Sequence, residues 1–133
     1  EIVSRDWSSD VCSSDLGLLP HYELDEALQH LRGFNPDAVC LLTRGGQGAS
    51  LYRGAERCDA RAPKVAVVDT VGAGDASVAG LLHSLAGHPD RPLRAHLHAA
   101  LAAGSAACLQ SGATPPPPAA MQQLFDQLEG EAP

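Results

Sequence analysis

The feature that most constrains this sequence is a glycine-rich turn over residues 69–75, DTVGAGD, which lies between an apolar segment and a helical pattern. The preceding residues 64–68, KVAVV, are rich in β-branched side chains and predict a buried strand. From Asp75 onward, apolar residues recur at helical spacing until Gly87, which predicts a helix that ends there. A strand, a glycine turn and a helix in succession are typical of an α/β protein.

Such a turn is suited to binding an anion. Gly72 and Gly74 let the chain point several backbone N–H groups toward one place, where the helix N-terminus adds partial positive charge. A carboxylate beside a bound anion is electrostatically unfavourable, so Asp75 suggests chemistry: it would accept the proton of an alcohol that attacks a phosphoryl group. The alternative is that Asp75 only caps the helix and the glycines only form the turn. The residues alone do not decide between the two interpretations.

The rest of the chain predicts helices and strands around one core. A hydrophobic fraction of 44% in 133 residues fits one small domain, and an aromatic fraction of 4% indicates a core of closely packed Ala, Val and Leu. Helices are predicted over residues 23–33, 75–85, 92–110 and 118–128, strands over 38–43, 49–53 and 64–68, a glycine-rich turn at 45–48 and a polar connection at 57–63.

Residues 1–16 differ in composition from everything that follows and show neither a helical nor a strand period. Residues 6–16, DWSSDVCSSDL, resemble a translated sequencing adapter. We therefore expect residues 1–16 to be a non-native segment and residues 17–133 to belong to a longer parent protein. The alternative is a disordered natural N-terminus.

Charge and cysteine spacing exclude several classes of protein. The formal net charge is -7, and residues 17–133 still carry 12 acidic against 8 basic residues, so neither nucleic acid nor an anionic membrane is an expected partner. No apolar run approaches the roughly 18 residues of a membrane span. The four cysteines lack CxxC spacing, which is typical of reduced thiols, and the six histidines form no metal-binding pattern. We expect a cytoplasmic protein.

The turn and its continuation AxxAGLL over residues 76–82 resemble the signature of the ribokinase-like carbohydrate kinases, the PfkB family. The family also has a strand followed by T-x-G-x-x-G, which Thr43, Gly45 and Gly48 match. The resemblance extends from Gly17 to Leu128. It implies an α/β fold, namely the C-terminal part of a ribokinase-like three-layer α/β/α domain with a mainly parallel sheet.

The resemblance also implies a reaction: transfer of the γ-phosphate of ATP to a hydroxyl of a sugar, in the manner of a fructokinase. By this resemblance, Asp75 is the catalytic base, and the N–H groups of Gly72, Ala73 and Gly74 form the anion hole for the γ-phosphate. The T-x-G-x-x-G residues would line the nucleotide phosphates. Sugar and ATP are the implied partners, and family members can form homodimers through a lid segment.

The cofactors implied by the resemblance are ATP and Mg²⁺, which would arrive together. Members of the family often bind a monovalent cation such as K⁺, and the matching positions here are Asp69, Val71 and the segment around Gly112. The adenine pocket would lie against the helix around residues 99–107. Arg44, beside the first glycine turn, could contact phosphate or remain a surface residue.

This sequence departs from the family pattern in two ways. Ser77 stands where an aromatic residue is common, and the upstream N-x-x-E motif, the sugar-binding strands and the lid are absent. We therefore expect negligible kinase activity from this chain by itself, and a noncatalytic nucleotide-binding or oligomerising remnant is one alternative. Another is a dinucleotide-binding oxidoreductase, but the third glycine of its G-x-G-x-x-G motif would fall at Ser77, and the acid expected about 20 residues later finds only Asp90.

Overall fold

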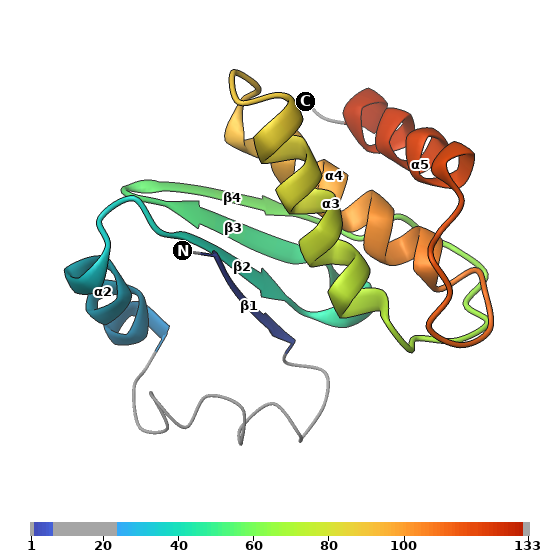
Figure 1. Ribbon diagram of the computed structural model, residues 1–133, viewed down its shortest axis with the longest axis horizontal. Helices are drawn as coiled ribbons and strands as arrows, with labels where there is room; N and C mark the ends of the chain where they lie inside the picture. Colours follow the sequence, from blue (N-terminus) through green and yellow to red (C-terminus); the bar gives the residue numbers. More distant parts are fainter. Residues whose placement is uncertain (1, 7–23, 132–133) are drawn as a thin grey trace.

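Four strands form one sheet in the order β1-β2-β3-β4, and helices cover both of its faces (Figure 1). The computed structural model describes residues 2–6 and 24–131. Its elements are, in chain order, β1 (Ile2–Asp6), α2 (Leu24–Phe34), β2 (Val39–Thr43), the 3₁₀ helix η1 (Gly45–Gln47), β3 (Ala49–Arg53), β4 (Glu56–Ala60), α3 (Ala73–Gly87), α4 (Leu93–Ala107) and α5 (Pro118–Glu131).

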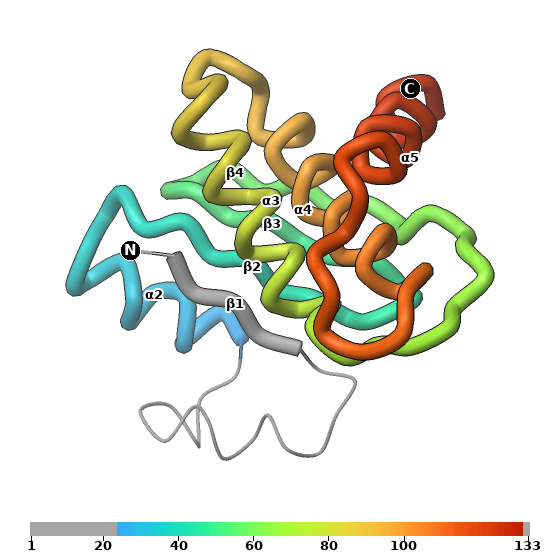
Figure 2. The backbone as a smooth tube through the Cα atoms, turned by 45° about the vertical axis from the view of Figure 1, so that its right-hand side comes forward, coloured from blue at the N-terminus to red at the C-terminus, as the bar shows by residue number. Residues whose placement is uncertain are grey.

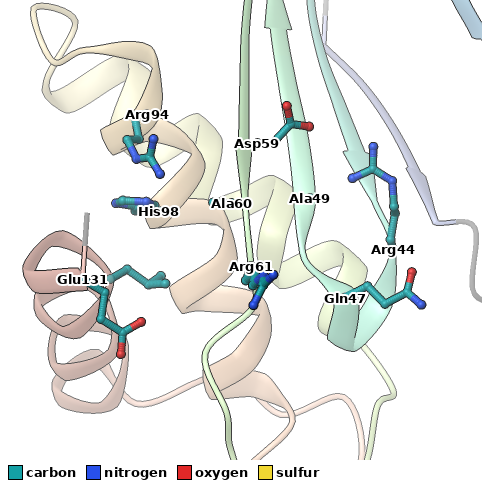
Figure 3. A pocket seen from close by; sticks show the side chains of 10 residues that line it. Arg44, Gln47, Ala49, Asp59, Ala60, Arg61, Arg94, His98 and Glu131 are labelled. Atoms are coloured by element: carbon teal, nitrogen blue, oxygen red, sulfur yellow. The ribbon is translucent and has the colours of Figure 1, made fainter. Parts of the chain in front are cut away.

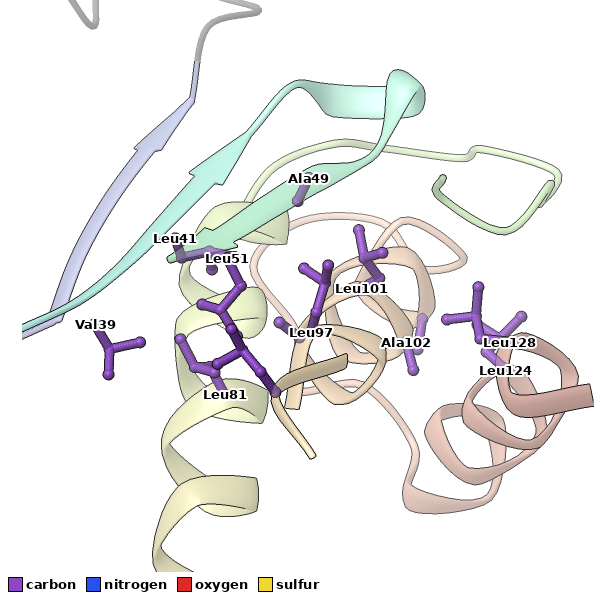
Figure 4. Close-up of a cluster of buried hydrophobic side chains, with 13 residues drawn as sticks. Val39, Leu41, Ala49, Leu51, Leu81, Leu97, Leu101, Ala102, Leu124 and Leu128 are labelled. Atoms are coloured by element: carbon purple, nitrogen blue, oxygen red, sulfur yellow. The ribbon is translucent and has the colours of Figure 1, made fainter. Parts of the chain in front are cut away.

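Two apolar clusters, one on each face of the sheet, explain the layers. Leu28 of α2 packs on Cys40, Leu42 and Tyr52, which come from one face of β2 and β3. The alternate strand residues point to the other face and join the larger core with α3, α4 and α5 (Figure 4). Helix α4 is buried along most of its length, between the sheet and α5. This is the predicted three-layer α/β/α arrangement.

Strand pairing in this part of the sheet differs from the predicted mainly parallel pattern. β1 pairs with β2 in parallel, whereas β2 with β3 and β3 with β4 are antiparallel. The length of each connection explains the difference. η1 and a two-residue turn with Gly54 at φ 57° are too short for a parallel crossover, whereas α2 lies between β1 and β2 and allows one.

Two local predictions around the sheet are wrong. Residues 64–68 form no strand, and Val67 and Val68 are 59% and 64% exposed. β-branched composition favours a strand only where a partner strand is available, and here the Val68 N–H group donates instead to the Cys108 carbonyl oxygen at 2.8 Å. Most of the predicted polar connection at 57–63 belongs to the edge strand β4, whose charged residues face solvent, as is common for exposed edges.

Residues 2–6 form the strand β1, although the sequence of this segment showed no strand period. The prediction of no regular structure there is therefore wrong. β1 pairs along its length with β2, from Ile2 opposite Val39 to Asp6 opposite Thr43. Backbone groups alone supply this pairing, so it does not need an alternating pattern of side chains. The pairing does not test the proposed origin of residues 1–16, and most of the adapter-like segment lies outside the described residues.

All four predicted helices form, with ends shifted by a few residues. Small residues let α3 and α4 cross closely: a Cβ atom on Gly80 would lie 2.7 Å from the Cβ atom of Ala103 and 2.7 Å from the Ala99 carbonyl oxygen. The abundance of Ala and Gly therefore reflects this close packing. Within the described residues, no helix has the length and apolar character that a membrane span requires.

Candidate functional site

A cavity of about 520 Å³, the motif cavity, lies between the two glycine motifs, residues 43–48 and 69–75. It lies between the turn after β2, the connection before α3, the first turn of α3 and the C-terminal half of α4. Its lining includes Thr43, Gly45 and Gly48 on one side and Ala73 and Gly74 on the other. Figure 2 shows that the loops before α3 and after α4 lie side by side at the same end of the molecule as this turn. Motifs about 30 residues apart thus meet around one cavity.

The backbone at Gly72 creates the start of α3. Gly72 is the N-cap with φ 81°, a left-handed conformation that glycine adopts at little cost, and α3 begins at Ala73 rather than at Asp75 as predicted. The Ala73 N–H group already donates to the Thr70 carbonyl oxygen at 3.2 Å. Within the described chain, the N–H groups of Gly72, Gly74 and Asp75 make no hydrogen bond. These three donors, rather than the predicted set that included Ala73, remain for an anion.

Asp75 lies at the edge of this site. It is the third residue of α3 and is exposed, and its carboxylate makes no hydrogen bond with the described residues. The neighbouring Gly74 lines the cavity, whereas Asp75 does not. The carboxylate is therefore accessible from the solvent side of the loop, beside the free N–H groups.

Asp69 ties the glycine turn to the loop after α4. Its Oδ1 atom accepts a hydrogen bond from the Val71 N–H group at 3.0 Å, and its Oδ2 atom accepts one from the Gly112 N–H group at 2.9 Å. These donors, Gly112 first and Val71 second, hold the pKa of the Asp69 carboxyl below its usual value. The three residues predicted for a monovalent cation thus form one hydrogen-bonded unit.

No larger cluster of metal-ligating side chains accompanies this unit. Among the described residues, His, Cys, Asp and Glu side chains do not gather in groups of three that could hold a metal ion.

Helix α4 contributes the wall opposite the connection before α3. Leu101, Gly104, Ser105 and Cys108 line it, within or next to the residues 99–107 that the resemblance assigned to an adenine pocket. Sequence reasoning had not identified Ser105 or Cys108 individually. A periodic Ala-rich helix does not reveal which of its small residues face a cavity.

Ser77, the departure from the family pattern, is buried against α4 and also lines the cavity. Its hydroxyl donates to the Ala73 carbonyl oxygen at 3.0 Å. Gly104 leaves room for it, because a Cβ atom on Gly104 would overlap the Ser77 hydroxyl and lie 3.1 Å from the Ala73 carbonyl oxygen. A serine opposite a glycine therefore allows the two helices to approach where an aromatic side chain would separate them.

Lys64 is a second residue that sequence reasoning missed, because residues 64–68 were predicted to be a strand. It is exposed, and among the described residues it is the only one lining this cavity that carries a charge. Pro63 is buried and Val65 packs against the main core, so the connection on both sides of Lys64 is anchored. The composition could have drawn attention to this residue, since Lys64 is the only lysine in the chain.

Arg44 does not line this cavity. Its guanidinium donates to the Ser50 hydroxyl at 2.6 Å, and the Arg44 side chain lies in a separate cavity at the other side of the turn (Figure 3). Its predicted alternative role as a contact to phosphate in the motif cavity is therefore not supported by its position.

A cavity bounded by a glycine turn after a strand and by free N–H groups at a helix N-terminus is typical of phosphate-binding sites in α/β proteins. The family is more specific: the chain belongs to the pfkB family of carbohydrate kinases, whose profile matches residues 14–120. This membership replaces the dinucleotide-binding oxidoreductase alternative.

Solved structures support the ribokinase-like fold. Phosphofructokinase-2 from Escherichia coli in complex with potassium is 26% identical, with a TM-score of 0.76 over 97% of this chain and 41% of that one. Fructokinase from Vibrio cholerae O395, bound to fructose, ADP and calcium ion, is 27% identical, with a TM-score of 0.71 over 93% of this chain and 40% of that one.

Aminoimidazole riboside kinase from Salmonella enterica, complexed with aminoimidazole riboside and an ATP analogue, is 29% identical, with a TM-score of 0.69 over 93% of this chain and 41% of that one. The chain thus spans about two fifths of the length of these kinases. No curated protein matches its sequence.

Proposed function

We propose that the protein to which this chain belongs transfers the γ-phosphate of ATP to a hydroxyl of a sugar, with a fructokinase-like substrate. The observation that carries the proposal is the single cavity between the T-x-G-x-x-G turn and the first turn of α3, with Asp75 beside it. Its volume of about 520 Å³ suits a nucleotide. The fructose and ADP bound to the Vibrio cholerae fructokinase, a relative of similar fold, agree with this substrate class.

The cavity, the free N–H groups and Asp75 would each have a separate role in the reaction. The nucleotide would occupy the cavity, with its terminal phosphate at the free N–H groups of Gly72, Gly74 and Asp75, where amide dipoles stabilise negative charge. The Asp75 carboxylate would accept the proton of the sugar hydroxyl from the solvent side. Phosphoryl transfer has a loose transition state, so positioning and charge stabilisation contribute most of the rate enhancement, and a weak base suffices.

Two metal ions, Mg²⁺ and K⁺, would take part in the reaction. Mg²⁺ would be carried by ATP and would neutralise charge on the phosphate oxygens. K⁺ would be held beside Asp69 and the carbonyl groups around Val71 and Gly112, where it would stabilise the loop that presents the free N–H groups. The potassium bound to phosphofructokinase-2 from Escherichia coli agrees with this assignment.

We also propose that the enzyme is cytoplasmic and forms homodimers through a lid.

We assign residues 1–16 to a non-native segment and residues 17–133 to the kinase domain. Resequencing the source locus with long reads that never carried the adapter would test this assignment. A reading frame that continues upstream of Gly17 into an N-x-x-E motif would support it, whereas a genuinely encoded DWSSDVCSSDL would contradict it.

Nucleotide binding is the direct test for this chain. We expect an ATP analogue to bind the purified 133-residue chain in isothermal titration calorimetry. Lys64→Ala should weaken this binding by about tenfold, the loss typical of one charge-assisted contact, and Lys64→Arg should restore most of it. Absence of binding by the wild-type chain would contradict the assignment of the cavity to a nucleotide.

A noncatalytic nucleotide-binding module remains the second candidate for the chain by itself. The position of Asp75 supports it, because the carboxylate is exposed and, in the described residues, no other element covers it. Incomplete exclusion of water would make phosphoryl transfer inefficient. Sugar-dependent release of ADP by the purified chain, abolished in Asp75→Asn, would contradict this candidate and favour a complete active site.

A further inference from the structure

A second cavity, of about 450 Å³, lies on the other side of the turn after β2 (Figure 3). Arg94 and His98 enter it from α4, Arg61 follows β4, and Arg44 and Gln47 come from the turn. It shares no lining residue with the motif cavity. The turn therefore divides its residues: Thr43 and the glycines face one cavity, whereas Arg44 and Gln47 face the other.

Positive charge predominates in this second cavity, although the chain has a net charge of -7. Of the residues that the structure describes, three arginines line it, against the two acids Asp59 and Glu131. The Asp59 carboxylate is already paired, because it accepts hydrogen bonds from Arg57, with Nε and Oδ2 2.9 Å apart, and from the Ser50 hydroxyl. Among the described residues, neither Arg61 nor Arg94 is in an ion pair. Two guanidinium groups are thus left for a ligand.

His98 adds a buried polar group to the same cavity. Its side chain is 3% exposed, and its Nδ1 atom forms a hydrogen bond of 2.6 Å with Glu129 Oε1 of α5. With Nδ1 bonded to Glu129, Nε2 is the ring nitrogen that remains. An imidazole that lines a cavity offers this second nitrogen as a group that a ligand can contact.

The position of Arg94 at the start of α4 also favours the binding of an anion. Arg94 is the second residue of α4, and the first turn of α4 contains no acid. A cation near a helix N-terminus is unfavourable, because that end already carries partial positive charge. An anion bound beside Arg94 would reverse this repulsion by interacting favourably with both the guanidinium and the helix end.

We propose that this cavity is a second binding site, specific for a small multivalent oxyanion such as a pyrophosphate or a phosphate ester. The guanidinium groups of Arg61, after β4, and Arg94, on α4, would bind its oxygens with charge-assisted hydrogen bonds. Arg44, which the Ser50 hydroxyl orients, and the Nε2 atom of His98 would complete the site. The ligand would contact the turn from the side opposite the nucleotide.

Inorganic pyrophosphate is the probe, titrated calorimetrically into the 133-residue chain in buffer without divalent ions. We expect saturable binding whose affinity falls as salt rises. Arg94→Ala and Arg61→Ala should each raise the dissociation constant about tenfold, the effect of one charge-assisted contact. Arg32→Ala on α2, across the sheet, is the charge-matched control and should leave it unchanged. Both target side chains are exposed, so the variants should fold, which circular dichroism would verify.

A repeat of the titration with an ATP analogue present separates the two cavities. Pyrophosphate should still bind, with the same dependence on Arg61 and Arg94. If the analogue displaces pyrophosphate and the arginine variants bind it as tightly as the wild type, the anion occupies the nucleotide cavity and the second site is refuted. No binding by the wild-type chain would refute it equally. Failure of the analogue to bind would count against the kinase proposal alone, because the arginine dependence would still be measurable.

Discussion

The Asp69 carboxylate accepts a hydrogen bond of 2.9 Å from the Gly112 N–H group, across 43 positions of sequence. With its second bond to Val71, it joins the loop before α3 to the loop after α4 at the edge of the motif cavity. Gly72 lies against the same loop, since a Cβ atom there would be 3.4 Å from Ala113 Cα. Asp69 therefore positions the turn that presents the free N–H groups.

Asp69→Asn should make stability less dependent on pH in the acid range. The pKa of Asp69 is lower in the folded chain than its ordinary value of 3.8, so its stabilisation is complete above that value and is lost as pH falls through the folded pKa. The variant lacks this contribution at every pH. Urea unfolding at neutral pH and near pH 3 should therefore show a difference between wild type and variant that shrinks on acidification. A constant difference would contradict the prediction.

Gly80→Ala should destabilise the chain by about 1–3 kcal/mol, the usual cost of overpacking. The new methyl group would meet Ala103 and the Ala99 carbonyl at 2.7 Å, so α3 and α4 would have to separate. Gly130→Ala is the matched control, because that helical glycine has no neighbouring atom within 4 Å of the position of its Cβ. It should be neutral or slightly stabilising, as alanine favours helix. Thermal unfolding of both variants measures the difference in stability between them, and an equal loss of stability in the two would refute the prediction.

Asp75→Asn in the proposed parent kinase should lower kcat by about 10²–10⁴-fold, the range for loss of a general base. The KM for ATP should change little, because Asp75 lies outside the lining of the cavity. Asp90→Asn, an exposed acid in the loop before α4, is the control and should retain activity. Steady-state assays of sugar-dependent ADP release provide both constants. A kcat near that of the wild type would reject Asp75 as the base.

His96→Gln should flatten the pH dependence of stability between about pH 7 and pH 5. His96 is fully buried beside Ser84, with 2.8 Å between Nδ1 and the hydroxyl, and its Nε2 atom has no hydrogen-bond partner in the described part of the chain. Burial, and secondarily the positive charge of Arg53, lower its pKa from the ordinary value of 6.5. The unfolded chain therefore binds a proton that the folded chain rejects, so wild-type stability falls as pH drops below 6.5.

Chemical denaturation at several pH values measures the slope of the free energy of unfolding against pH. A loss of stability that is the same at every pH does not change this slope. His88→Gln is the control, because His88 is exposed, and it should keep the slope of the wild type. A slope in His96→Gln equal to that of the wild type would show that other groups cause the pH dependence.

The sequence by itself determined the family, the positions of the helices and the two glycine motifs. Their signals are local: apolar periodicity over 10 or more residues, and turns that only glycine readily forms. Asp75, Gly72 and Gly74 were recognised in this way. The predicted association of Asp69, Val71 and Gly112 came from the family resemblance, and the structure places these three residues together.

Only the tertiary structure decided which segments pair and which residues share a cavity. Residues 64–68 have the composition of a strand, but the loop after α4 supplies the hydrogen bond that a partner strand would have made. β4 forms from a polar segment because the short turn at Gly54 brings its backbone onto β3. Lys64, Ser105 and the arginines of the second cavity acquire their surroundings from elements distant in sequence. Such contacts depend on packing in three dimensions, which no local pattern encodes.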